Sequence, residues 1–194
     1  MLLMLRKGLR VATVMAVLPW VVPAVAQYAR SSVNLPSATT AFESRFDLDG
    51  DGRSDLVAVF HRRVLVFFQK SDGTFPSAPD VEIGSGDPVP EEYAAVAIGR
   101  VEEGPGAQLI LLGDKGVDYL TVAQMRGESS DPVAPKPLLR RNFGLSSGPT
   151  LQFLDVATDV DGDGRAELLL PNSDQIEIYR RDVGGTYTLS SRLT

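Results

Sequence analysis

The chain has 194 residues, a formal net charge of −6, one histidine and no cysteine. An acidic surface repels nucleic acid and anionic lipid, so neither is expected as a partner. The lack of cysteine excludes disulfides, a thiol nucleophile and a lipidated cysteine anchor, and this length suits one domain or a short array of repeats.

The N-terminal segment is typical of a cleavable export signal. Basic residues between positions 6 and 10 precede an apolar run at 11–22, and residues 24–26 read Ala-Val-Ala. Small residues there suit a signal peptidase, so we expect cleavage after Ala26 and a secreted or periplasmic protein. A membrane anchor is the alternative, but the run falls short of the roughly 20 apolar residues that a bilayer needs. Without residues 1–26, 16 Lys and Arg face 25 Asp and Glu, a net charge of −9.

An internal repeat follows a predicted linker at residues 27–38. Residues 46–56, FDLDGDGRSDL, return as residues 158–168, TDVDGDGRAEL, at an offset of 112 residues. Each copy continues into a pair of apolar runs, and DGTF at 72–75 then matches GGTY at 184–187. An altered middle copy at residues 98–109 lies 53 residues after the first loop and 59 before the last.

This repeat predicts three units in residues 39–194, at about 39–90, 91–147 and 148–194. Each unit has short β-rich runs separated by Gly, Asp, Ser or Pro, and no stretch has a helical apolar period. Residues 81–90 and 131–137 are predicted connectors. We therefore expect an all-β fold of β-propeller-like blades, each with about four strands. A β-sandwich with a coincidental duplication is the alternative.

Two aspartate-rich loops are the candidate sites. In the first loop, acids at alternate positions are followed by glycines that permit sharp curvature. Calcium takes six to eight oxygen ligands, so such a loop suits it. The predicted ligands are Asp47, Asp49, Asp51, the Arg53 carbonyl and Asp55 in the first loop, and Asp159, Asp161, Asp163, the Arg165 carbonyl and Glu167 in the last. We expect two Ca²⁺ ions, and none in the middle loop, where Arg100, Gly104 and Gln108 replace acids.

Two other interpretations of these loops are a solvated acidic turn and an EF-hand. A solvated acidic turn would need no ion, but it does not explain why the same acids and glycines occur twice. An EF-hand would need a bidentate Glu at its twelfth position, where Ala58 and Leu170 stand. Strand-like residues also follow each loop where an EF-hand has a helix, so the EF-hand is rejected.

The loop, the strand pair and the closing DGTF together resemble the FG-GAP or VCBS repeat, the unit of integrin-α-type β-propellers. The resemblance covers residues 39–194 and implies the same ligand sets in the first and third units. Closed propellers have four or more blades, whereas three units are counted here. The three units are therefore expected to belong to a larger propeller, to self-associate, or to close in a different way.

The function expected is a non-catalytic, calcium-rigidified binding, adhesion or scaffold module for a protein or glycan ligand. His61 lies in a predicted hairpin turn, and neither a histidine cluster nor a GxSxG motif is present, so no enzyme activity is expected. The alternative is a carbohydrate-binding propeller or an accessory part of a larger secreted enzyme. A sugar site needs exposed aromatic residues, and several of the five considered for it occupy core-facing strand positions, which disfavours such a site. The five are Tyr93, Tyr119, Phe143, Tyr179 and Tyr187.

Overall fold

The computed structural model describes residues 32–37, 39–84, 89–128, 134–172 and 174–194. Within them the chain forms 13 strands in three separate sheets and a single short helix. The all-β class is thus confirmed, and none of the three sheets is closed. The predicted signal peptide, residues 1–26, lies outside the described residues.

Sheet A is an antiparallel meander of four strands, β1 (Thr39–Phe46), β2 (Asp55–Phe60), β3 (Arg63–Phe67) and β4 (Val81–Ile83). The first acidic loop joins β1 to β2. Because β2 and β3 are rich in Val, Leu and Phe, they form the buried centre of the sheet. The hairpin turn between them places His61, at a φ of 53°, on the surface.

Sheet B repeats this meander with β5 (Tyr93–Gly99), β6 (Gln108–Gly113), β7 (Gly116–Leu120) and β8 (Lys136–Arg140). A fifth strand, β9 (Gln152–Phe153), pairs with β5 in parallel. A four-residue helix, α1 (Val122–Met125), follows β7 and begins with a capping box between Thr121 and Gln124. Among the described residues no helix has the length and apolar character to cross a membrane.

Sheet C is the third meander, with β10 (Ala157–Thr158), β11 (Glu167–Asn172), β12 (Gln175–Arg181) and β13 (Tyr187–Leu193). Residues 151–158 correspond to β1 at the repeat offset of 112 residues. Here, however, that stretch is divided. Its beginning pairs with sheet B as β9, and its end pairs with sheet C as β10. The first strand of the third unit therefore crosses from one sheet to the next.

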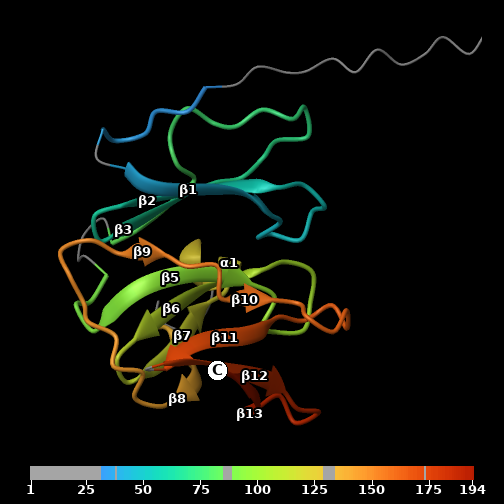
Figure 1. Cartoon of the computed structure of the whole chain (residues 1–194). Coiled ribbons are helices and arrows are strands. Elements are labelled where there is room, and N and C mark those ends of the chain that lie inside the picture. Colours follow the sequence, from blue (N-terminus) through green and yellow to red (C-terminus); the bar gives the residue numbers. More distant parts are fainter. Residues whose placement is uncertain (1–31, 38, 85–88, 129–133, 173) are drawn as a thin grey trace, which may run out of the picture.

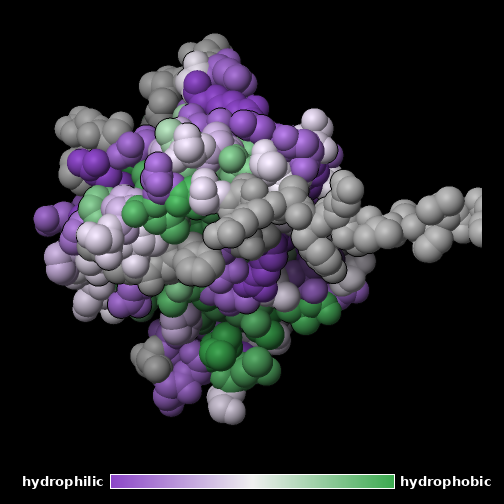
Figure 2. Space-filling model, turned by 90° about the horizontal axis from the view of Figure 1, so that it is seen from above, coloured by the Kyte–Doolittle hydropathy of each residue, from purple (hydrophilic) through white to green (hydrophobic). Residues whose placement is uncertain are grey.

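The three sheets lie one above another, with sheet A at the top and sheet C at the bottom of Figure 1. One apolar core fills the space between sheets A and B, and a second lies between sheets B and C. A smaller cluster on the far side of sheet A packs Leu56, Ala58, Leu65 and Phe67 against Val33, Leu35 and Phe75. Seen from that end in Figure 2, hydrophilic residues surround smaller hydrophobic patches.

The strand pairs predicted after each loop are confirmed as β2–β3, β6–β7 and β11–β12. The prediction of connectors at residues 81–90 and 131–137 was partly wrong. Val81–Ile83 is β4 and Lys136–Arg140 is β8, the outermost strand of its meander. Edge strands tolerate proline and exposed polar residues because one row of their backbone groups faces solvent. Their sequences consequently lack the apolar alternation that identifies a strand.

Candidate metal centre

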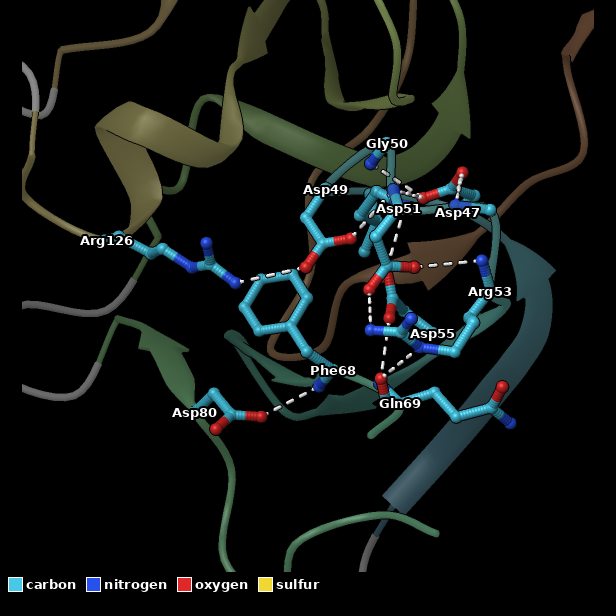
Figure 3. A network of polar contacts seen from close by, with 12 residues as sticks. Asp47, Asp49, Gly50, Asp51, Arg53, Asp55, Phe68, Gln69, Asp80 and Arg126 are labelled. Carbon is cyan, nitrogen blue, oxygen red and sulfur yellow. Dashed lines mark hydrogen bonds and ion pairs between the residues drawn. The ribbon is translucent and has the colours of Figure 1, made fainter. Parts of the chain in front are cut away.

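The first acidic loop, residues 47–55, folds around its own carboxylates. Carboxylate oxygens of Asp47, Asp49 and Asp51 lie within 4.8 Å of one another. Asp47 accepts backbone N–H groups from Gly50 at 2.7 Å and Gly52 at 2.9 Å. Both glycines have positive φ, 80° and 84°, which turns these N–H groups inward. The curvature of the loop therefore aims three carboxylates at one region (Figure 3).

The third-unit loop, residues 159–167, reproduces this geometry. Asp159 accepts the N–H groups of Gly162 at 2.7 Å and Gly164 at 2.9 Å, and the two glycines have φ values of 80° and 87°. Here the oxygens that lie within 4.8 Å of one another belong to Asp159, Asp161 and Glu167. The sequence repeat is thus a structural repeat, down to individual hydrogen bonds.

The last acid of each loop also fixes the loop to its sheet. Asp55 is fully buried and accepts the N–H of Leu48 at 2.8 Å and of Gln69 at 3.0 Å. Burial raises the pKa of its carboxyl, an effect that the two N–H donors oppose. Glu167 accepts the N–H of Val160 at 2.7 Å in the same way. Asp55 thus cross-links the two ends of its loop with the end of β3.

An arginine is paired with the second aspartate in both loops, although the two come from different places. Arg126, next to α1, lies 3.3 Å from Asp49 and stacks 4.0 Å from the ring centroid of Phe68 (Figure 3). Arg180 of β12 lies 3.5 Å from Asp161. Arg180 occupies the repeat position that Phe68 occupies in the first unit. The third unit therefore supplies this arginine from its own strand, whereas the first unit receives its arginine, Arg126, from the second unit.

The side chains of the two loop arginines, Arg53 and Arg165, both contact other parts of the protein. Arg53 folds back, donating to the Gln69 carbonyl at 2.9 Å and pairing with Asp51. Arg165 reaches the middle loop and lies 3.1 Å from Glu103. Their carbonyls remain predicted ligands.

The middle loop keeps the fold without the acids. Gln108 stands where Asp55 does in the first loop, and its amide oxygen accepts the N–H of Val101 at 2.8 Å, matching the Leu48–Asp55 bond. No group of metal-ligating acids is found in this loop, whose residues are all described. Gln108 therefore replaces the carboxylate as a hydrogen-bond acceptor but brings no charge.

Successive loops are joined by the same hydrogen bond. The N–H of Ala107 donates to the Asp47 carbonyl at 2.8 Å, and the N–H of Ala166 donates to the Arg100 carbonyl at 2.9 Å. These are equivalent positions in neighbouring units. Gly106 has to be glycine for this contact, because a Cβ there would lie 2.3 Å from the Leu48 carbonyl oxygen. The three loops thus lie next to one another along one side of the stack.

The donor set fits a hard divalent cation. Both clusters offer carboxylate oxygens alone, the ligands that Ca²⁺ prefers, and neither contains the nitrogen or sulfur of a zinc site. Oδ2 of Asp47, which accepts the Gly52 N–H, retains a second lone pair for a metal, whereas its Oδ1 accepts the N–H groups of both Gly50 and Asp51. Asp55 and Asp163, also predicted as ligands, do not belong to the clustered triads and instead accept backbone N–H groups.

Residues outside the loops offer little for another ligand. The five aromatic side chains considered for a sugar site are all buried, as expected for core positions. His61 packs edge-on against Phe60 in its turn. No family model matches the chain, and no curated protein matches it.

Proposed function

We propose that this chain is a calcium-stabilised β-repeat module of the FG-GAP or VCBS kind, exported and acting as a non-catalytic binding or scaffold domain. In this proposal sheets A, B and C are three propeller-type blades. The observation that carries it is the matched geometry of the two acidic loops, each with converging carboxylates and two glycines of positive φ.

The clustering of the carboxylates supports a bound metal ion, because without a cation their mutual repulsion would destabilise the loops. Three carboxylates whose oxygens lie within 4.8 Å of one another repel strongly at neutral pH. Hydrogen bonds from loop N–H groups offset part of this repulsion, as do Arg53 and Arg126 in the first loop and Arg180 in the last. A bound Ca²⁺ ion would supply the remaining positive charge. Asp47, Asp49 and Asp51 would hold it in the first loop, and Asp159, Asp161 and Glu167 in the last.

The scaffold role rests on where the loops lie. Each loop joins the first two strands of its sheet, and its neighbour contacts it through a backbone hydrogen bond. Fixing a loop therefore fixes the boundary between two sheets. A row of rigid loops along one side of a β-stack is a surface on which a protein or glycan ligand could be held.

Calorimetric titration of metal-free protein tests the proposal. We expect two Ca²⁺ ions per chain, with Asp49→Asn and Asp161→Asn each removing one. Glu102→Gln, in the middle loop, is the matched control and should leave both. A stoichiometry of zero, or of three, would contradict the assignment.

A further inference from the structure

Each sheet of this protein has one face that meets the following sheet. In sheet A this face carries Val57, Val59, Val64 and Val66, all at most 1% exposed in the core with sheet B. The repeat places Ile110, Leu112, Val117 and Tyr119 at the same positions in sheet B, where they are buried against sheet C. Two successive sheets thus use the same four positions to form an apolar interface.

In sheet C these four positions are Leu169, Pro171, Ile176 and Ile178. They are still apolar, and strand pairing adds Leu193, which lies opposite Ile176. Yet Ile176 is 42% exposed and Leu193 54% exposed, whereas Val64, the counterpart of Ile176, is fully buried. We call these five residues the outer face of sheet C. It has the composition of an interface, and no described residue covers Ile176 or Leu193.

The exposure of apolar residues is concentrated in this part of the molecule. All the large hydrophobic side chains that are exposed among the described residues belong to the third unit: Val160, Ile176, Val183, Leu189 and Leu193. Pro171, Ile176 and Leu193 also line a shallow hollow. Ile176 and Leu193 lie opposite each other on neighbouring strands, so they form one apolar patch, and an exposed apolar patch marks an interaction site.

We infer that the outer face of sheet C is a self-association surface, and that it pairs with the same face of a second copy around a two-fold axis. In sheets A and B the equivalent face is covered by another sheet of this chain, so a sheet of the same kind is the occupant that fits. A second copy supplies one. The inference does not depend on calcium.

A head-to-tail contact between copies is the competing arrangement, and the structure disfavours it. Such a contact would need the far side of sheet A as the partner surface. That side is already covered, because Val33, Leu35 and Phe75 pack on it and leave Phe67 fully buried. A two-fold contact needs only the exposed face, used twice, and it closes as a dimer where a head-to-tail contact would grow into a chain.

Sedimentation equilibrium of the purified protein over micromolar to submillimolar concentrations tests the inference. We expect a monomer–dimer equilibrium, with Ile176→Lys and Leu193→Lys each raising the dimer Kd by roughly tenfold or more. Both residues are already exposed, so the variants should fold. The control is Val183→Lys, which changes an exposed valine in the β12–β13 turn, away from the face, and should leave the Kd unchanged.

Mixing two variants tests the symmetry. Ile176→Lys and Ile176→Glu should each fail to self-associate, whereas an equimolar mixture should form dimers, because a two-fold axis brings opposite charges together. A monomer at every concentration would overturn the inference and leave the face to another partner. Dimers weakened equally by Val183→Lys, or no rescue on mixing, would also overturn it.

Discussion

The Arg126 guanidinium lies 3.3 Å from the Asp49 carboxylate, 77 residues away in sequence and in a different sheet unit. It therefore competes with any cation for a predicted ligand of the first loop. Its stacking on Phe68 holds it there. Binding of an ion in the first loop would consequently be coupled to the position of α1 in the second unit.

Replacing this arginine should strengthen the first site. In Arg126→Ala the competing ion pair is lost, and an exposed pair is worth about 0.2–1 kcal/mol, so we expect the calcium Kd of the first loop to fall by about 1.4- to 5-fold. Calorimetry on an Asp161→Asn background isolates that site. Arg63→Ala, which removes an ion pair with Glu82 far from the loop, is the control and should not change the Kd.

Calcium should stabilise the fold by mass action. If each site has an extracellular-type Kd of about 10⁻⁴ to 10⁻³ M, millimolar calcium adds roughly 0.4–1.4 kcal/mol per site. Two sites would then raise the Tm by about 2–11 °C relative to protein in EDTA. Magnesium should substitute poorly because it gives up its water shell reluctantly. Identical melts in calcium, magnesium and EDTA would show that the loops are acidic turns only.

Arg62 should contribute more to stability than any exposed arginine. Its buried guanidinium donates to four carbonyls, at 2.8 Å to Val89, 2.7 Å to Gly148 and 2.7 Å to Tyr93, and also to Pro90. Arg62→Ala removes all four bonds, and the Pro90 carbonyl keeps the Tyr93 N–H as a donor, so we expect a loss of at least about 3 kcal/mol and a Tm lower by about 6 °C or more.

The neighbouring residue provides a matched control. The Arg63 side chain is 42% exposed and pairs with Glu82 on the surface, so Arg63→Ala should shift the Tm by less than about 2 °C. Thermal melts of both variants in the presence of calcium make the comparison. Equal shifts would mean that the four carbonyl contacts contribute nothing beyond the loss of a surface charge.

The buried carboxyl of Glu177 should make the stability of the fold depend on pH. Its carboxylate is fully buried, which raises its pKa, but hydrogen bonds from Tyr179 at 2.8 Å and Arg192 at 3.1 Å outweigh that effect and hold the pKa below the ordinary value of 4.5. A depressed pKa means that the folded state releases this proton more readily than the unfolded chain. The stabilisation is therefore present above about pH 4.5 and is lost as the pH falls through the depressed pKa.

Glu177→Gln should accordingly lower the Tm at pH 7 by several degrees. The difference in Tm between the variant and the unmodified protein should become smaller below pH 4.5. Melts between neutral pH and about pH 3 measure the gap. Glu103→Gln, at an exposed side chain, is the control. A gap that stays constant across this range would show that the Glu177 contacts do not depend on its charge.

Sequence patterns predicted the centre of each sheet and missed its edges. Residues 56–60 and 64–67 are almost wholly apolar because both faces of the strands are buried, and that signal is local. β4 and β8 lie at edges, where Glu82 and Pro137 interrupt the pattern. The prediction that no stretch is helical missed α1, although the Thr121–Gln124 capping box marks its start in the sequence.

The candidate loops were readable for the same reason, since their acids and glycines are close in sequence. The arginines that pair with these acids differ in how far the sequence predicts them. Arg180 lies on the strand that pairs with β11, next to the Leu168–Tyr179 pair, so the register of the hairpin would have placed it near Glu167. Arg126 gives no such signal, because only the packing of α1 near sheet A brings it to Asp49.

The hydrogen bonds between successive loops involve main-chain atoms alone, from the N–H of Ala107 to the carbonyl of Asp47 and from the N–H of Ala166 to that of Arg100. Changing the side chain of the acceptor residue leaves such a bond in place. The backbone bonds between neighbouring units therefore do not depend on whether position 47 or 100 carries an acid or a base. Acids could accordingly be introduced into the middle loop at Arg100 and Gln108 without removing the hydrogen bonds that join the three loops.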